Sequence, residues 1–488
     1  MKEWLLPPES TPSPALETAA GGSSLLSRIL SQRGISDPEI AQAYLNPDAY
    51  QPTPAGELPD MEAAADRILT AVQTREPLCV WGDFDVDGQT STTTLVATLR
   101  ELGANVSYYI PVRARETHGV HIPRLAEILD SGVSLVLTCD TGITAHEAVD
   151  YARQRSVDMI ITDHHDLPPD LPNALAVVDP KRLPDGHPLG TLPGVGVAYK
   201  LVEELYRRSG RGGEEAQFLD LAAMGIIADL ALLTGDTRYL AQRGLAALRS
   251  PQRLGLKVMM ELAELNPAHL TEEHIGFTIA PRLNALGRLD DANPVVEFLT
   301  TSDLTRARVL ASQLEGLNAR RKLLTDQVFQ AALSQIENDL SLLETAALVL
   351  SHPSWPGGVI GIVANRLVER YHKPTILISA PPGETARGSA RSINGCNITA
   401  AIAEQSEMLA GFGGHPMAAG LGIDPERISE FRRAVSRSVQ KQIGSEKPVD
   451  SLQIDALAAL PDLSLDLAHD LEKLAPFGAG SPPVIWAS

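Results

Sequence analysis

Val80-Trp81-Gly82-Asp83-Phe84-Asp85-Val86-Asp87-Gly88 is an acidic turn in which three aspartates at alternate positions follow a short apolar run. The residues from Leu78 to Trp81 predict a buried strand, and those from Ser91 to Leu99 predict a helix. Strand, turn and helix make one half of a βαβ unit, where ligands bind beyond the carboxyl ends of the strands. Because the three carboxylates repel one another, a divalent cation is the simplest group to offset the repulsion.

A calcium-binding EF-hand loop is one alternative for the acidic turn. Such a loop needs flanking helices and a glutamate at its twelfth position, and counting from Asp83 that position is Thr94. The EF-hand interpretation therefore fails, whereas a solvated turn and a metal site both stay possible.

The composition narrows the class of protein. The 488 residues carry a formal net charge of −20, which argues against coating nucleic acid through bulk electrostatics. A narrow basic groove, or an anionic substrate held through metal ions, stays compatible with that charge. Cys79, Cys139 and Cys396 show neither a disulfide framework nor zinc-site spacing, which fits a reducing cytoplasm. We find no apolar stretch of roughly 18 residues and no signal pattern, so we expect no membrane partner.

Further apolar strands are expected between helices in the first part of the chain. They span residues 106–110, 133–140, 157–163 and 174–179. Continuous apolar strands that alternate with helices indicate a parallel sheet covered on both faces. Asp83, Asp140 and Asp163 all end such strands, so we expect these acids to converge at one edge of the sheet. Asp229 also ends an apolar run, although a helix cap is an alternative for it.

Asp163-His164-His165 stands at the end of a predicted strand. A pair of histidines alone is typical of a surface turn, but two other strands that end in acids favour metal binding here. Because neighbouring residues of a strand cannot both face one point, we expect one imidazole to bind metal and the other to reach the substrate. Oxygen ligands with one or two imidazoles suit Mn²⁺ or Mg²⁺. Two such ions about 3.5–4 Å apart would form a phosphoryl-transfer clamp.

Four motifs resemble, in the same order, those of the DHH phosphoesterase superfamily: residues 82–88, Asp140-Thr141-Gly142-Ile143, Asp163-His164-His165 and Ala228-Asp229. Segments 192–198, 281–289, 358–364 and 476–478 resemble its RecJ branch of single-stranded-DNA exonucleases. Residues 388–392 and 413–420 are similar to the substrate-binding domain that accompanies the DHH domain. The likeness runs from about residue 25 to the end of the chain.

The resemblance implies a metal-dependent 5′→3′ exonuclease that hydrolyses phosphodiester bonds of single-stranded DNA in repair and recombination. It implies two Mn²⁺ or Mg²⁺ ions, a cytoplasmic location and, as possible protein partners, a helicase or a single-strand-binding protein. The implied metal ligands are Asp83, Asp85, Asp87, Asp140, His164 and Asp229. The implied catalytic residues are Asp163 and His165, with His165 on the scissile phosphate. The implied substrate-binding residues are Arg113, Arg282, Arg288, Ser389, Arg391, Ser392 and His415. For Arg282 and Arg288, buried structural pairing is an alternative.

The expected fold class is α/β, with a parallel-sheet DHH domain joined by a long helix to a smaller α/β DHH-associated domain and followed by a truncated C-terminal segment. The expected parts are an N-terminal arm with short helices at 1–55, the DHH catalytic domain at 56–302, the connecting helix at 303–340, the DHH-associated domain at 341–445 and an incomplete, OB-fold-like region at 446–488. Residues up to about 24 are expected to form a loose arm. A glycine-flanked loop around Ser389 and Arg391 is expected to offer backbone N–H groups to a phosphate.

The sequence departs from the family pattern at three places. Glu116-Thr117-His118-Gly119 stands where the family usually has Glu-Gly-Tyr-Gly, Trp355-Pro356 replaces Trp-His, and the chain stops where an OB-fold domain usually follows. Three alternatives stay open. The first is a DHH-family phosphoesterase acting on short oligonucleotides or nucleotide phosphates, the second is a non-catalytic scaffold, and the third is DNA binding through a helix–hairpin–helix at residues 192–198.

Overall fold

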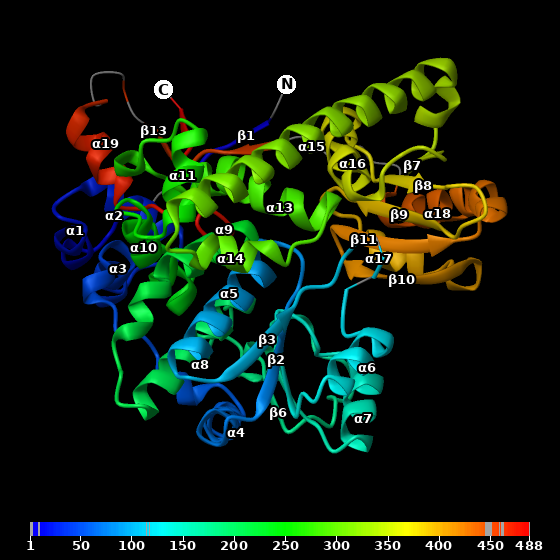
Figure 1. Ribbon diagram of the computed structural model, residues 1–488. Helices are drawn as coiled ribbons and strands as arrows, with labels where there is room; N and C mark the ends of the chain where they lie inside the picture. Colours follow the sequence, from blue (N-terminus) through cyan, green and yellow to red (C-terminus); the bar gives the residue numbers. More distant parts are fainter. Residues whose placement is uncertain are drawn as a thin grey trace. The chain divides into compact units, whose positions relative to one another are not determined.

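The computed structural model describes residues 3–7, 10–113, 115–116, 118–444, 451–457, 459 and 463–487. The chain forms two compact units (Figure 1). The first unit is made of Met1–Leu314 together with Asp450–Ser488, and the second of Glu315–Val449. The expected boundary between residues 445 and 446 lies outside the described residues, and the division into five parts stays a prediction.

A five-stranded parallel sheet organises the first unit. Its order is β3-β2-β4-β5-β6, with the strands β2 (Pro77–Trp81), β3 (Asn105–Tyr109), β4 (Leu135–Cys139), β5 (Asp158–Thr162) and β6 (Ala176–Val178). All five strands run parallel, as the continuous apolar runs predict. The acids that follow these strands therefore lie along one edge of the sheet.

Helices cover both faces of this sheet (Figure 1). Cys79, Trp81 and Met159 pack with α6 (Ile122–Asp130) and α7 (His146–Gln154) on one face. Because neighbouring strand residues point to opposite faces, Val80 and Ile160 are buried on the other face. The helices there are α4 (Met61–Thr74), α5 (Val86–Glu101) and α8 (Gly194–Arg208).

A helical layer completes the first unit. Its helices are α9 (Leu219–Ala228), α10 (Gly235–Leu248), α11 (Leu254–Leu262), α12 (Glu272–His274), α13 (Ala280–Leu289) and α14 (Pro294–Thr300). One turn of π-helix, η6 (Ile275–Ile279), joins α12 to α13. Within the described residues, no helix is long and apolar enough to cross a membrane.

The two ends of the chain pack together in the first unit. The N-terminal elements are β1 (Glu3–Leu5), α1 (Pro14–Ala19), α2 (Ser24–Gln32) and α3 (Pro38–Leu45), and the C-terminal ones are β12 (Ser451–Gln453), β13 (Ala456–Leu457), α19 (Leu465–Glu472) and β14 (Trp486–Ala487). Strand β1 pairs with β12, and Leu16 and Leu474 belong to one apolar cluster. The expectation of a loose arm is wrong for residues 14–19, because Ser13 caps α1 and Leu16 is buried.

Arg238, a buried residue of α10, links these two ends of the chain through hydrogen bonds. Its buried guanidinium donates hydrogen bonds to the carbonyl oxygens of Tyr44, Leu474, Ala475 and Pro476, over distances from 2.9 to 3.1 Å. It also lies 3.6 Å from the centroid of the Tyr44 ring. Burial lowers the pKa of Arg238 to about 10, so the group still carries its charge at neutral pH.

We expect Arg238→Ala to lower the free energy of unfolding by on the order of 3–5 kcal/mol, because it leaves several buried carbonyl groups without a donor. The matched control is Arg243→Ala on the same helix, which removes an exposed ion pair with Asp48. That control is expected to cost at most about 1 kcal/mol. Urea unfolding of both variants measures the difference, and equal losses would contradict the role of Arg238.

The second unit is a smaller α/β body that contains most of the long helix α15 (Leu304–Asn338). Its sheet has the order β10-β11-β9-β8-β7, with β7 (Leu348–His352), β8 (Thr375–Ser379), β9 (Ala386–Arg391), β10 (Leu409–His415) and β11 (Ala418–Ile423). Only β7 and β8 pair in parallel among these strands. The helices are α16 (Gly357–Tyr371), α17 (Ile398–Ala403) and α18 (Ile428–Ile443).

The glycine-flanked loop expected around Ser389 and Arg391 is wrong. Both residues lie in β9, which pairs with β8 on one side and β11 on the other. The backbone of β9 is therefore used in pairing with these two strands. Gly388 is needed for packing, because a Cβ there would come within 2.9 Å of the Leu421 side chain. Glycine in this segment therefore marks a crowded strand rather than a turn.

Candidate metal centre

Four strands of the first sheet lead into an aspartate. Asp83 follows β2 after one glycine, and Asp140, Asp163 and Asp179 directly follow β4, β5 and β6. All four side chains are buried. The convergence of the first three was predicted. Asp179 was missed as a candidate, although it follows an apolar run in the same way as the others.

The acidic turn is fixed at its two later aspartates. Asp85 caps α5, where its Oδ1 accepts a hydrogen bond from the Gly88 N–H at 3.2 Å. Asp87 accepts hydrogen bonds from the N–H groups of Gly194 at 2.7 Å and Val195 at 2.8 Å. These two donors open helix α8, whose N-terminus favours a negative charge. Residues 194–198, part of the proposed helix–hairpin–helix, thus begin a helix that holds Asp87.

Possible ligand atoms gather in three groups, within each of which the atoms lie no more than 4.8 Å apart. The groups are Asp83 with Asp85 and Asp140, Asp87 with His164 and Asp229, and Asp140 with His164 and His165. Together they contain all six of the predicted metal ligands. Asp140 and His164 each belong to two groups and so connect the whole cluster.

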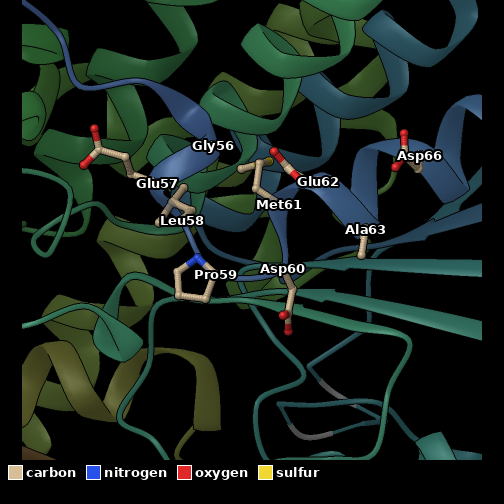
Figure 2. Close-up of a pocket in the computed structure, with 9 residues that line it drawn as sticks. All are labelled: Gly56, Glu57, Leu58, Pro59, Asp60, Met61, Glu62, Ala63 and Asp66. Carbon is tan, nitrogen blue, oxygen red and sulfur yellow. The ribbon is translucent and has the colours of Figure 1, made fainter.

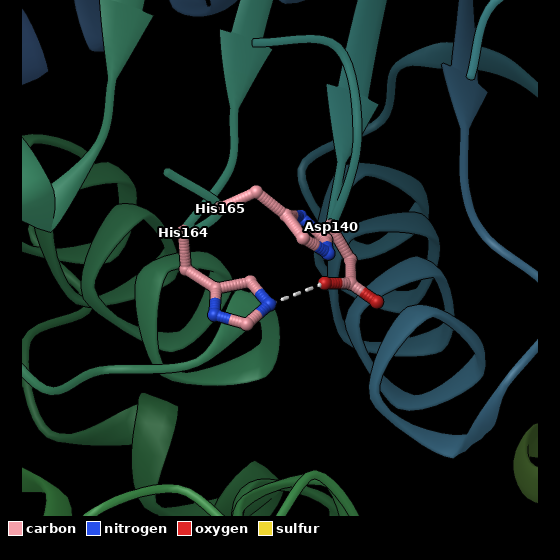
Figure 3. Close-up of side chains that lie close together, drawn as sticks. All are labelled: Asp140, His164 and His165. Carbon is pink, nitrogen blue, oxygen red and sulfur yellow. Dashed lines mark ion pairs between the residues drawn. The ribbon is translucent and has the colours of Figure 1, made fainter. Parts of the chain in front are cut away.

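Asp140 and His164 face each other across the strand ends (Figure 3). His164 Nε2 lies 3.0 Å from Asp140 Oδ1 and 3.8 Å from Asp87 Oδ2. Asp140 adopts a left-handed backbone conformation with φ of 60°, a strain that is typical of functional positions. Both rings come within reach of Asp140, so the premise that the two imidazoles cannot face one point is wrong. The assignment of one imidazole to metal and the other to the substrate stays a prediction. The chain bends after β5, so strand alternation does not separate the two rings.

Asp163 contacts the two histidines and the Ile143 backbone rather than the other carboxylates. Its Oδ1 lies 2.7 Å from His165 Nδ1 and accepts the backbone N–H of His164 at 2.7 Å, while its Oδ2 accepts the Ile143 N–H at 2.9 Å. Burial is the largest single influence and would raise the pKa of Asp163, but the hydrogen bond from His165, the charges of His165 and His164 and the Ile143 N–H together lower it. Burial alone would lower the pKa of His165, but the hydrogen bond to Asp163 and the negative charge of that residue raise it to about 9. Asp163 therefore orients His165 rather than joining the ligand groups.

The carboxylates of the cluster are short of positive partners. Burial, followed by repulsion from neighbouring carboxylates, raises the pKa values of Asp85, Asp87 and Asp140 above the ordinary range. The pKa of Asp229, at the C-terminal end of α9, also rises to about 7, because protein atoms surround its carboxyl group and Asp85 repels its charge. The residue as a whole is nevertheless exposed to solvent. Asp83 Oδ1 is buried and accepts no hydrogen bond, while the buried Asp140 Oδ1 lies 3.0 Å from His164 Nε2. Such a donor set, made of oxygens with imidazole nitrogen, fits divalent ions.

Without divalent ions, we expect the protein to lose stability as the pH rises from about 6 to about 9. Folded Asp179 and Asp229 hold their protons up to a pKa of about 7, against roughly 4 in an unfolded chain. Folded His165 holds its proton up to a pKa of about 9, against roughly 6.5 when unfolded. The folded state therefore binds more protons over this interval, so rising pH favours unfolding. Thermal unfolding in EDTA tests the sign, and a melting temperature that increased with pH would contradict it.

Arg113 and His118 close over the acidic turn. The Arg113 guanidinium lies 3.8 Å from the centroid of the Phe84 ring, and the His118 ring centroid lies 4.2 Å from it. His118 Nδ1 is 3.2 Å from Asp83 Oδ2. Arg113 thus stands beside the cluster, and its role as a phosphate contact stays a prediction. His118 was noted in the sequence only as a departure from the family, and its neighbour Thr117 lies outside the described residues.

Arg282 and Arg288 lie on α13, which packs against the acidic turn. A Cβ at Gly287 would come within 1.9 Å of the Phe84 carbonyl oxygen, so the two backbones touch. Arg282 Nη1 donates to the Thr278 carbonyl at 2.7 Å. The local pairing of Arg282 matches the structural alternative, and a substrate role for either arginine stays a prediction.

The other predicted substrate residues lie in the second unit. Ser389 and Arg391 belong to β9 and His415 ends β10, while Ser392 follows β9 and donates from its Oγ to the Cys396 carbonyl at 2.7 Å. Arg391 Nη2 would lie 3.0 Å from a Cβ at Gly361. The glycine of α16 therefore leaves space for this guanidinium. The roles of these four residues in binding a strand stay predictions.

A pocket lined by residues 56–63 and Asp66 lies before and along the start of α4 (Figure 2). It contains none of the ligand groups described above. Its carboxylates are Glu57, Asp60, Glu62 and Asp66, and Asp60 is already bonded to Arg182 and to the Val177 N–H. We therefore place the functional site at the strand ends and not in this pocket.

Comparison with known proteins gives the family. The model of the DHH family, N-terminal domain, matches residues 77–226, and that of the DHHA1 domain matches residues 344–441. The single-stranded-DNA-specific exonuclease RecJ of Bacillus subtilis (strain 168) is 36% identical over 462 residues, which cover 94% of this chain but only 58% of that protein. The RecJ of Haemophilus influenzae is 33% identical over 478 residues, covering 94% of this chain and 82% of the relative.

Solved structures agree with these relatives. RecJ from Thermus thermophilus in complex with Mn²⁺ matches with a TM-score of 0.85 and 30% identity, over 99% of this chain and 69% of that chain. A structure from the same organism in complex with Mg²⁺ matches with a TM-score of 0.78 and 28% identity, over 99% and 67%. The α/β fold class and the resemblance in the sequence are thereby confirmed. The chain belongs to the RecJ family of single-stranded-DNA-specific exonucleases, within the DHH family.

Proposed function

We propose that this chain removes nucleotides from single-stranded DNA in the 5′→3′ direction, with two Mn²⁺ or Mg²⁺ ions bound at the strand ends. The observation that carries the proposal is the cluster of acids and imidazoles at the strand ends, in which the buried Asp83 Oδ1 accepts no hydrogen bond. Because the chain spans 58% of the Bacillus relative, the activity of that protein is a proposal here. Metals found with relatives support the choice of ions.

The ligand groups suggest how the ions would be shared. Asp83, Asp85 and Asp140 would hold one ion, while Asp87, His164 and Asp229 would hold the other. Asp140 would lie between them, since it also groups with His164. The bound ions would activate water and stabilise the charge that develops on the scissile phosphate. The N-terminus of α8 would keep Asp87 in place throughout, because its two N–H groups donate to that carboxylate.

His165 would act on the phosphate. Its Nδ1 contacts Asp163, which keeps the ring protonated near neutral pH and fixes its orientation. The protonated Nε2 would donate a hydrogen bond to the scissile phosphate and stabilise its charge as the bond to O3′ breaks. Arg113, which is stacked on Phe84, would offer its guanidinium to a neighbouring phosphate.

A nuclease assay on strands labelled at the 5′ or the 3′ end tests the function. With Mn²⁺ or Mg²⁺, we expect a 5′ label to be released first as a mononucleotide, and EDTA to stop the reaction. Blunt duplexes are expected to be degraded far more slowly than single strands. Release of the 3′ label first would overturn the direction, and a higher rate on a dinucleotide than on a long strand would favour the oligonucleotide phosphoesterase.

We also propose a cytoplasmic location and, as protein partners, a helicase or a single-strand-binding protein. The three cysteines support the location, because all of them are buried and unpaired in the described part of the chain. The proposed substrate supports these two partners, because a helicase would produce single-stranded DNA and a single-strand-binding protein would hold it. Co-purification of the full chain with each candidate, before and after nuclease treatment, tests for direct contact.

A further inference from the structure

Phe277 is an exposed aromatic side chain beside the metal centre. Its exposed fraction is 83%, the highest among the exposed large apolar residues of the described chain. Leaving a phenylalanine in water forgoes the free energy that its burial would contribute. Phe277 also lies in the π-helix η6, an arrangement that occurs mostly as single turns at functional sites. The position is therefore unfavourable for stability and needs another explanation.

The π-helix η6, which carries Phe277, packs on α9, the helix that leads into the ligand Asp229. A Cβ at Gly276 would lie 3.9 Å from the Ile227 side chain, so η6 rests on the last turn of α9. Asp229 follows that turn directly. After Asp229 comes Leu230, with a left-handed φ of 59° and an exposed fraction of 75%. Phe277 and Leu230 are thus exposed side chains on two segments that meet at the end of α9.

The helix that follows η6 extends along the same site. Helix α13 touches the acidic turn through Gly287 and Phe84, and Gln89 Nε2 donates to the carbonyl oxygens of both Phe84 and Leu283. Arg282 holds the end of η6 through its bond to the Thr278 carbonyl. Phe277 is thereby fixed on a packed element rather than on a loose loop.

The chemistry of a single strand identifies what would cover Phe277. When a scissile phosphate lies at the ions, the neighbouring unpaired bases extend outward from the strand ends. Every base has a flat face that stacks on an aromatic ring, whatever the sequence. A chain with a net charge of −20 gains little grip from bulk electrostatics, so stacking would supply affinity that charge does not.

We propose that Phe277 stacks on a nucleobase of the single strand close to the scissile phosphate and so binds the strand without regard to sequence. This inference rests on the proposed function, since it takes single-stranded DNA as the ligand. It assigns to η6 a role in substrate binding, and it makes Leu230 a secondary apolar contact.

The test combines a variant with an abasic site moved along the strand. For the wild-type protein with Mn²⁺, one abasic position near the 5′ end is expected to lower kcat/KM roughly 5- to 100-fold, the usual range for one stacked base. Phe277→Ala is expected to lower kcat/KM on the intact strand by a similar factor, chiefly through KM. The same abasic site should then cost the variant nothing further. Phe277→Trp should restore the wild-type pattern.

The control is Leu465→Ala, which removes a side chain with an exposed fraction of 80% from α19. It is expected to leave kcat/KM and the abasic profile unchanged. Fluorescence anisotropy with a labelled oligothymidylate, in Mn²⁺ at low temperature, gives a binding readout besides turnover. Equal abasic penalties in the wild type and Phe277→Ala would overturn the stacking, as would unchanged affinity of the variant, which would leave an apolar protein partner as the occupant. A wild-type protein without nuclease activity would instead refute the proposed function.

Discussion

The Asp140→Asn variant is expected to lose nuclease turnover by a factor on the order of 10³ and, without divalent ions, to unfold at a higher temperature than the wild type. Both effects come from one carboxylate, which belongs to two ligand groups and lies close to His164. Asparagine keeps the shape of the side chain but removes the negative charge that the ions require. In EDTA the same change removes a repulsion, because burial and then Asp87 hold the pKa of Asp140 well above its ordinary value.

Thermal unfolding separates these two effects. Mn²⁺ should raise the melting temperature of the wild type by mass action and leave that of Asp140→Asn nearly unchanged. Asp150→Asn is the matched control, since Asp150 is an exposed residue of α7 that pairs only with Arg153 among the ion pairs described. It should behave as the wild type in both assays. An active Asp140→Asn protein, or one that Mn²⁺ still stabilises fully, would refute the proposed ligand role.

Gly194→Ala is expected to lower turnover by on the order of 10²-fold, although it replaces none of the ligand residues. The added Cβ would lie 2.6 Å from the Cβ and from Oδ1 of Asp140, closer than van der Waals contact allows. The start of α8 must then shift, which disturbs Asp140 and the two N–H donors of Asp87 together. Overpacking of this kind also costs roughly 1–3 kcal/mol of stability.

Gly357→Ala is the matched control for this substitution. Gly357 also follows a proline at the first position of a helix, α16, but a Cβ there would meet no atom within 4 Å. Alanine at that position should leave turnover unchanged and raise stability by about 0.4–1 kcal/mol. Turnover and manganese-dependent stabilisation of both proteins measure the contrast. Wild-type turnover in Gly194→Ala would show that the site tolerates displacement of α8.

Regular patterns made much of the fold predictable. The apolar runs before Asp83, Asp140 and Asp163 are continuous, so they predicted parallel strands, and parallel strands bring their carboxyl ends to one edge. The alternation of strands with helices is an equally local signal. Reasoning about topology alone therefore predicted that the three acids lie at one edge of the sheet, where the structure places them.

What escaped prediction depends on contacts between distant segments or on local crowding. The bonds from the start of α8 to Asp87 join residues more than a hundred positions apart, which no periodicity reveals. Gly388 has the composition of a turn but serves a packed strand, because its neighbour Leu421 leaves no space for a side chain. His165 lies at a bend after β5 rather than in a strand, so alternation does not separate its ring from that of His164.

The first unit is discontinuous, because Asp450–Ser488 joins Met1–Leu314 only after the whole second unit has been made. During synthesis, the ribosome takes from several seconds to about half a minute to add the intervening residues. Over that interval the nascent chain has Arg238 in place but lacks Leu474, Ala475 and Pro476, whose carbonyl oxygens it binds later. We therefore expect Asp450–Ser488 to bind to a first unit whose other residues are already folded around Arg238. A nascent chain that stalls before this segment is made is expected to bind chaperones.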